Sequence, residues 1–236
     1  MQLCFATGNL RQSIGKIDLV QTLSKLDIDG IEWTFGKEFG ERPITDKDAD
    51  FLRTFDFVSI HSPFRFSSYY LSAVELEKGK KTLEESSKLV RSKQVVIHPS
   101  QIFPSNFFAN CSFQVITENL NPKKGKVRPR LGFEKTLKAN SNWGLCLDVC
   151  HAFDWSEEET ARIVSKWKHR IKQVHFSNNR YHKDHLPFEK VSRAFLKSIE
   201  PVLGLNVPFV IEEDMPYTSI KQIKEEIARV RKILSL

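Results

Sequence analysis

The sequence predicts a single (β/α)8 barrel from three observations. Short apolar runs rich in β-forming residues alternate with longer helical or polar stretches, eight such runs are present, and 236 residues suit a compact barrel. Alternating strands and helices are typical of a parallel sheet. An open doubly wound sheet is the main alternative, but no GxGxxG motif follows the first strand. We expect one domain over residues 1–236.

The predicted strands are spread along the whole chain. They are Leu3–Thr7, Gly30–Thr34, Phe57–Ile60, Val95–Ile97, Phe113–Thr117, Gly144–Leu147, Ile171–Phe176 and Phe209–Ile211. The predicted helices are Ile17–Leu26, Leu71–Ser92, one from Ser156 to about Lys168 and one from Thr218 to about Leu234.

Two of these helices have expected N-caps. Ser156 and Glu159 have the spacing of a capping box, in which the serine accepts from a backbone N–H and the glutamate reaches back. Thr218 is the expected cap of the last helix. The linker Arg42–Asp50 is predicted to be irregular.

Composition and charge limit the classes of protein. The chain is 40% hydrophobic and 28% charged, as in an ordinary globular protein, and no apolar run approaches the roughly 18–20 residues of a membrane span. Four cysteines without a CxxC pair and a start without a basic segment lead us to expect no signal peptide and a cytoplasmic location. A net charge of +7 favours a polyanionic partner.

Ionisable residues collect where the predicted strands end. These residues are His61, His98, Glu118, Asp148 with His151, His175 and Glu212, and His182 and His185 lie between the last two strands. In a parallel barrel the carboxyl ends of the strands converge on one mouth. Crowded carboxylates and imidazoles would repel or desolvate one another unless a divalent cation lay between them. The sequence therefore predicts a metal site of zinc, manganese or iron type at this mouth.

Several short motifs carry a resemblance to a known superfamily. Asp148-Val-Cys-His151-Ala-Phe is similar to the D-x-C-H-A-F turn of the endonuclease IV enzymes. The matching positions elsewhere are His61 in SIHSP, His98 in VIHPS, Glu118 in TENL, His175 in VHFSN and Glu212 in VIEED. The chain thus resembles the xylose isomerase-like barrels, a superfamily that includes endonuclease IV, over more than half its length.

The resemblance implies a role for each matching residue. His61 and His98 would hold one zinc, and Glu118 would bridge to a second zinc. Asp148, His175 and Glu212 would complete the second site, and His151 would help to hold a third zinc. Such a cluster of two or three ions activates water and neutralises a phosphate. Endonuclease IV enzymes cleave DNA on the 5′ side of an abasic site.

One segment departs from the endonuclease IV pattern. That family completes its third zinc site with D-x-H, whereas this chain has His182-Lys-Asp184-His185. The following HLP sequence is similar to sugar isomerases and epimerases of the same superfamily. In those relatives one divalent ion, held here by Glu118, Asp148, His175 and Glu212, would suffice, and Glu118 and Glu212 would move a proton beside a polarised carbonyl.

Other residues near the predicted mouth have two interpretations. The segment Asn121–Arg130 contains five basic residues, and Lys123 and Lys124 would contact phosphates or lie in a solvated loop. Arg180 is another candidate phosphate ligand. Phe64 and Arg65 would stack on exposed bases or pack beneath their loop.

Three functions are therefore open. The first is a metal-dependent nuclease that acts on abasic DNA, and the second is an isomerase or epimerase of a sugar or sugar phosphate. The third is a barrel that only binds a ligand. Glu32, which ends the second strand, is not expected to be a metal ligand.

Overall fold

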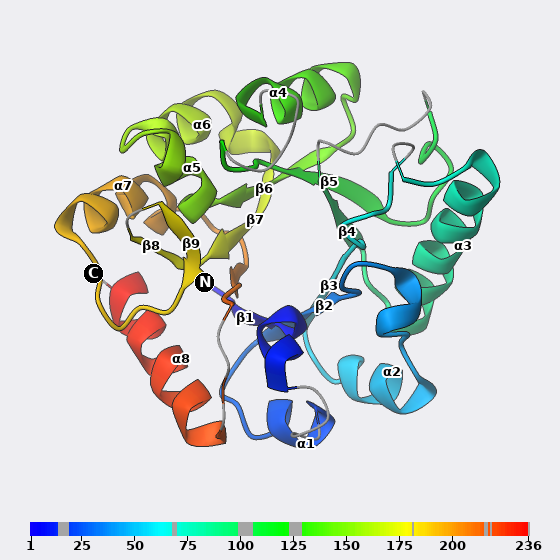
Figure 1. Ribbon diagram of the computed structural model, residues 1–236, viewed down its shortest axis with the longest axis horizontal. Helices are drawn as coiled ribbons and strands as arrows, with labels where there is room; N and C mark the ends of the chain where they lie inside the picture. The colour runs from blue at the N-terminus through cyan, green and yellow to red at the C-terminus, as the bar shows by residue number, and fades with distance from the viewer. Residues whose placement is uncertain are drawn as a thin grey trace.

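The apolar runs of the sequence form a closed barrel of eight parallel strands in the computed structural model (Figure 1). The structure describes residues 1–13, 19–67, 70–98, 106–122, 129–180, 182–214, 217 and 219–235. The barrel strands are β1 (Leu3–Ala6), β2 (Gly30–Thr34), β3 (Phe57–His61), β4 (Gln94–Ile97), β5 (Gln114–Glu118), β6 (Gly144–Asp148), β7 (Ile171–Phe176) and β10 (Phe209–Ile211). Every predicted strand is confirmed, and β1 pairs with β10 to close the barrel.

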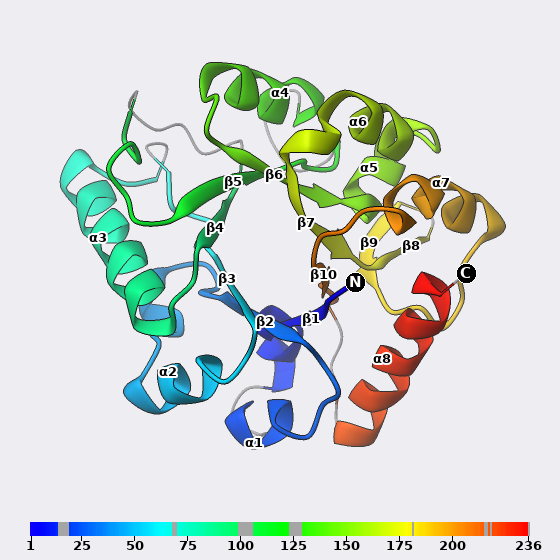
Figure 2. The same cartoon turned by 180° about the vertical axis from the view of Figure 1, so that it is seen from behind.

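The helices form a ring outside the strands, as Figures 1 and 2 show from opposite sides. They are α1 (Leu19–Leu23), α2 (Asp46–Leu52), α3 (Ala73–Val90), α4 (Pro129–Ala139), α5 (Val149–Trp155), α6 (Glu159–Trp167), α7 (Arg193–Leu203) and α8 (Ile220–Leu234), with short 3-10 helices at Thr7–Ser13, Phe39–Glu41 and Lys168–Arg170. This arrangement confirms the predicted (β/α)8 barrel. None of the described helices has the length and apolar character needed to cross a membrane.

Alternation along each strand decides which residues reach the barrel interior. Leu3 and Phe5 of β1 belong to the large apolar core, whereas Cys4 and Ala6 pack in a separate small cluster with Val210 of β10. Successive side chains of a strand point to opposite faces, so every second residue points inward. The same alternation carries the last inward residue of each strand to the mouth.

A two-stranded hairpin, absent from the predictions, lies between β7 and α7. Its strands are β8 (Asn178–Arg180) and β9 (Lys183–Leu186), paired antiparallel with Arg180 opposite Lys183. The Asn178 side-chain amide donates to the carbonyls of Pro187 and Lys190 and so ties the base of the hairpin. The hairpin carries Asp184 and His185 towards the mouth.

Two predicted caps are wrong. Ser156 is the C-cap of α5 in extended conformation, and α6 begins at Glu159 without a side-chain cap, because the Glu159 carboxylate pairs with Arg162 instead. At the last helix, the Ser219 hydroxyl accepts from the backbone N–H of Gln222. The cap therefore follows Thr218, which lies outside the described residues.

The segment predicted to be irregular contains a helix, and α4 has no counterpart among the predicted helices. Thr45 caps α2 with a complete capping box, so the linker Arg42–Asp50 is partly helical. Pro129 begins α4, at a position where its missing N–H has no cost. The other helix predictions hold with shorter bounds, as α3 shows, and the part of Ile17–Leu26 before residue 19 lies outside the described residues.

Candidate metal centre

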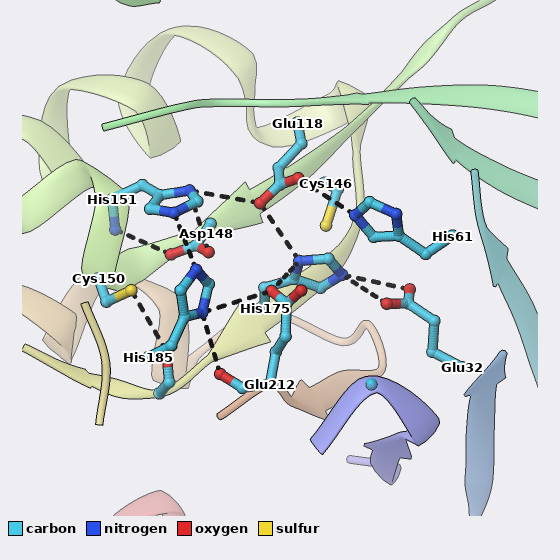
Figure 3. Close-up of polar contacts among 12 residues, drawn as sticks. Glu32, His61, Glu118, Cys146, Asp148, Cys150, His151, His175, His185 and Glu212 are labelled. Carbon is cyan, nitrogen blue, oxygen red and sulfur yellow. Dashed lines mark hydrogen bonds and ion pairs between the residues drawn. The ribbon is translucent and has the colours of Figure 1, made fainter. Parts of the chain in front are cut away.

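The inward residues at the strand tips come together at one end of the barrel (Figure 3). They are His61 from β3, His98 after β4, Glu118 from β5, Asp148 from β6, His175 from β7 and Glu212 after β10. Glu118 and Asp148 are almost completely buried. Parallel strands bring these side chains together because all of them end at the same edge of the barrel.

The first group of residues with suitable geometry for a metal ion is formed by His61, His98 and Glu118. The Oε2 atom of Glu118 lies 3.0 Å from Nε2 of His98 and 3.5 Å from Nε2 of His61. One donor atom from each residue lies within 4.8 Å of the others. Two imidazoles and one carboxylate suit zinc or a similar ion.

The second group contains Glu118, Asp148, His175 and Glu212. The Nδ1 atom of His175 lies 2.8 Å from Oε2 of Glu212 and 3.4 Å from Oε1 of Glu118. Because Glu118 presents one oxygen to each group, it joins the first group to the second.

The third group contains Asp148, Cys150, His151 and His185. The Nε2 atoms of His151 and His185 are 3.2 Å apart, and Oδ2 of Asp184 lies 3.5 Å from Nε2 of His151. Asp148 belongs to both the second and the third group, so the three groups form one continuous cluster.

A left-handed backbone conformation turns His185 of the hairpin into the third group while the preceding Asp184 stays close to it. Neighbouring residues of a regular strand point to opposite faces, which is why D-x-H is the expected spacing. His185 has a φ of +53°, a conformation that few non-glycine residues adopt. The side chains of Asp184 and His185 thereby approach the same nitrogen of His151.

Asp148 also explains the spacing of its motif. Its Oδ1 atom accepts from the backbone N–H of His151 at 2.8 Å and caps α5, which begins directly after β6. Its Oδ2 atom lies 3.1 Å from Nδ1 of His151. The D-x-x-H spacing is therefore that of an N-cap and its third helical residue.

Backbone carbonyls orient three of the histidines. The Nδ1 atom of His61 lies 2.8 Å from the Ser62 carbonyl, that of His151 lies 3.0 Å from the Asn119 carbonyl, and that of His185 lies 3.2 Å from the Glu212 carbonyl. In the neutral imidazole, the form that binds a metal ion, a proton on each Nδ1 leaves Nε2 unprotonated and directed into the cluster. Metal-binding histidines are usually held in this way.

The cluster shifts the pKa values of its members in opposite directions. Burial opposes charge on His61, but the hydrogen bond to Glu118 and the charges of Glu32, Glu118 and Glu212 outweigh it and raise the pKa of His61 to about 9. Burial also opposes charge on Glu118, yet close contacts with the imidazoles of four histidines hold its pKa well below the usual 4.5. Burial raises the pKa of Asp148.

The donor set fits divalent metal ions. Four buried atoms, Glu118 Oε2, Asp148 Oδ2, His175 Nδ1 and Glu212 Oε2, lie close to ionisable neighbours but form no hydrogen bond of good geometry among the described residues. Buried polar atoms without a hydrogen bond are costly, and coordination would satisfy them. Imidazole and carboxylate donors favour zinc, manganese or iron.

The remaining predicted site residues lie at or outside the edge of the cluster. His182 is exposed, at 72%, and its Nδ1 atom faces Asp154 at 3.3 Å. The Phe64 ring lies 5.5 Å from the His98 ring, and Arg65 pairs with Glu38 at 3.1 Å. Arg180 is exposed on β8. Lys123 and Lys124 lie outside the described residues.

Sequence reasoning missed two contributors to the cluster. Cys150 is absent from the predicted site residues, but its thiol lies within the third group. Asn119 bonds across the barrel wall, because its side chain donates to the Asp148 carbonyl and accepts from the Asp148 N–H, each at 2.8 Å. Its position directly after Glu118, at a strand tip, was the available signal.

Comparison with known proteins identifies the fold. No family model and no curated protein matches the chain. Among solved structures, a xylose isomerase domain-containing protein from Salmonella typhimurium has a TM-score of 0.73 at 16% identity, covering 100% of this chain and 97% of its own.

Two enzymes of different chemistry are also structurally similar. D-psicose 3-epimerase, solved in the presence of D-fructose, has a TM-score of 0.66 at 13% identity and covers 100% of both chains. Endonuclease IV from Thermus thermophilus has a TM-score of 0.63 at 16% identity, covering 98% of this chain and all of its own. The chain therefore has the fold of the xylose isomerase-like (β/α)8 barrels.

Proposed function

We propose that this protein is a metal-dependent phosphodiesterase that cleaves DNA at abasic sites. The observation that carries the proposal is the continuity of the three donor groups, which share Glu118 and Asp148. A mononuclear site needs only one such group. The third group supports the nuclease in particular, because it includes His185, one of the hairpin residues whose order departs from D-x-H.

The chain's own residues would hold the metal ions and orient the reacting groups. Metal ions bound there would supply a water activated at neutral pH and would stabilise negative charge on the phosphate. Hydrolysis adds the water oxygen to phosphorus and breaks the P–O3′ bond, which leaves a 3′-hydroxyl. Glu118 joins the first two groups and Glu212 belongs to the second, and either carboxylate could accept the proton of that water.

Residues at the edge of the cluster would contact the nucleic acid. Phe64 is 46% exposed beside His98, so its ring could stack on a base next to the lesion. Arg65 and Arg180 are exposed and could neutralise backbone phosphates. The net charge of +7 supports a polyanionic substrate.

A second function, isomerisation or epimerisation of a sugar, is favoured by a cavity beside Glu212 and His185. The cavity has a volume of about 210 Å³, and its polar lining includes Asn9, Glu41, Arg42 and Asp214. Acidic side chains outnumber the one arginine, so this cavity suits hydroxyl groups better than phosphates. For such a substrate the second donor group alone would hold the one ion required.

Metal content and substrate cleavage together test the proposal. The purified protein should hold close to three zinc equivalents per chain and should incise a duplex that carries one abasic site, but not the intact duplex. About one equivalent, with no incision and with turnover of a ketose or aldose, would overturn the nuclease assignment in favour of the sugar enzyme. Absence of both metal and turnover would reject both.

A further inference from the structure

The ring nitrogen of His175 that points away from the cluster has a different kind of partner from the corresponding nitrogens of the other histidines. Its Nε2 atom faces the carboxylate of Glu32, 3.2 Å from each oxygen, while its Nδ1 atom faces the cluster (Figure 3). His61, His151 and His185 use backbone carbonyls for the same purpose. Glu32 lies on β2, across the barrel from β7, and does not belong to any of the three donor groups.

Glu32 is itself fixed by two buried donors. The Ser59 hydroxyl donates to its Oε2 atom at 3.0 Å, and the Gln173 side-chain amide donates to the same atom at 2.6 Å. The Gln173 carbonyl oxygen in turn accepts from the Gln94 amide at 3.1 Å. Glu32, Ser59 and Gln173 are each 0% exposed.

Glu32, Ser59 and Gln173 form a polar layer inside the barrel, where most barrels have apolar side chains. Burying a carboxylate costs free energy unless it accepts hydrogen bonds, so a buried glutamate at this place indicates a functional role. The contact with His175 supplies one. The Gln173 amide nitrogen also lies 2.9 Å from Nε2 of His175. The charged Glu32 carboxylate is the stronger partner, because hydrogen bonds to charged groups exceed those between neutral groups. By accepting from Nε2–H it keeps the proton on that nitrogen, leaves Nδ1 unprotonated and makes the imidazole a more basic ligand.

We propose that Glu32 is a positioning residue that fixes the tautomer and orientation of His175 and thereby sets the metal affinity of the second donor group. Ser59 and Gln173 hold Glu32 in place for this role. The inference rests on the metal-binding part of the proposed function. It predicts a hierarchy of affinities in which the second group depends on a carboxylate that the first and third groups do not use.

The test is a zinc titration of the metal-stripped protein against a chromophoric chelator, for the wild type and for Glu32→Gln. Glutamine keeps the size of the side chain but presents at most one acceptor oxygen. We expect zinc affinity at one site to fall by about 10- to 100-fold, the usual effect of losing such a partner. The other sites should keep their affinities.

A spectroscopic measurement separates positioning from general loosening of the barrel. Two-bond ¹H–¹⁵N spectra of the zinc-loaded wild type should show His175 protonated at Nε2, and in Glu32→Gln its signal should move or broaden while those of His61 and His151 stay. Glu226→Gln is the matched control. Glu226 is equally buried but contacts the Phe188 N–H, Arg229 and Glu213, none of which belongs to a donor group, so all sites should keep wild-type zinc affinity.

Ser59→Ala provides a milder variant if Glu32→Gln does not fold. It removes one of the two donors that hold Glu32, and we expect a smaller loss at the same site. Wild-type zinc affinity together with an unchanged His175 spectrum in the folded variants would overturn the inference. A wild-type protein that binds no zinc would instead overturn the proposed function, so the two failures are distinguishable.

Discussion

Glu118 is the residue on which most of the proposed cluster depends. It belongs to two donor groups and lies within 3.5 Å of a nitrogen of each of four histidines. Its pKa is held well below 4.5 although it is buried, so a negative charge persists at the centre of the site. Loss of that charge should therefore weaken metal binding more than it lowers the stability of the fold.

Glu118→Gln is expected to lose metal from the first and second groups and to remove most activity. The reduction should exceed the roughly 10- to 100-fold effect of losing an outer partner, because a direct ligand is removed. Zinc per chain, incision of abasic DNA and thermal unfolding would be measured together. Wild-type activity in a variant that retains its metal would show that the site lies elsewhere.

The two left-handed histidines of the hairpin form a matched pair for testing the third group. His182 and His185 have φ values of +58° and +53°, so replacement by alanine carries a similar backbone cost at both positions. His185→Ala should lower zinc from about three to about two equivalents per chain, whereas His182→Ala should leave it unchanged. Loss of zinc from His182→Ala but not from His185→Ala would mean that His182, and not His185, contributes to the cluster.

At the scale of elements, α5 anchors the β8–β9 hairpin. The Asp154 Oδ1 atom accepts from the Asn179 side-chain amide at 2.8 Å and lies 3.3 Å from Nδ1 of His182. The Asn179 amide also donates to the Cys150 carbonyl at 3.1 Å. These bonds connect the helix that carries His151 to the hairpin that carries His185, so they hold the third group together.

Asp154→Asn should loosen this connection without touching a donor atom. Hydrogen exchange over residues 178–186 should accelerate, and zinc affinity should fall about tenfold at one site, consistent with loss of an outer-shell contact. Glu189→Gln, an exposed change just beyond the hairpin, serves as the control. Equal exchange in Asp154→Asn and the wild type would mean that the hairpin is held by other contacts.

For the whole molecule, the cluster makes stability depend on pH when metal is absent. The pKa of His61 is raised from 6.5 to about 9, so its contribution is fully present below pH 6.5 and is lost as the pH rises through 9. The pKa of Glu118 is lowered from 4.5, so its contribution is present above pH 4.5 and is lost as the pH falls.

The metal-free protein should therefore be most stable between about pH 4.5 and 6.5 and should lose stability by about pH 9.5. Bound zinc replaces the imidazole protons, so the loaded protein should retain its stability at the alkaline end. Thermal unfolding with and without chelator across this range tests both statements. Equal alkaline losses in the two forms would argue against metal binding by His61.

Local sequence was sufficient for the strands but not for several connections. β6 was predictable because its apolar run is continuous, as expected of a strand buried on both faces, whereas β7 was predictable from Ile171, Val174 and Phe176 among polar residues. The hairpin of β8 and β9 was missed because Asn178–Leu186 is polar and lacks an alternating pattern. Ser156 has the sequence pattern of an N-cap, but the Glu159 carboxylate pairs with Arg162 instead of reaching back, so the predicted capping box does not form.

The sequence by itself determined the barrel and the identities of the donors at the strand tips, such as His61, Glu118 and Asp148. It could do so because a period of two and a common strand direction carry each last inward residue to one mouth. Only the tertiary structure decided how the donors divide into groups. It placed Glu32 against His175, 143 positions away, and turned His185 inward through a left-handed backbone. Both depend on the closure of the barrel and the packing of the hairpin, which no local pattern of residues encodes.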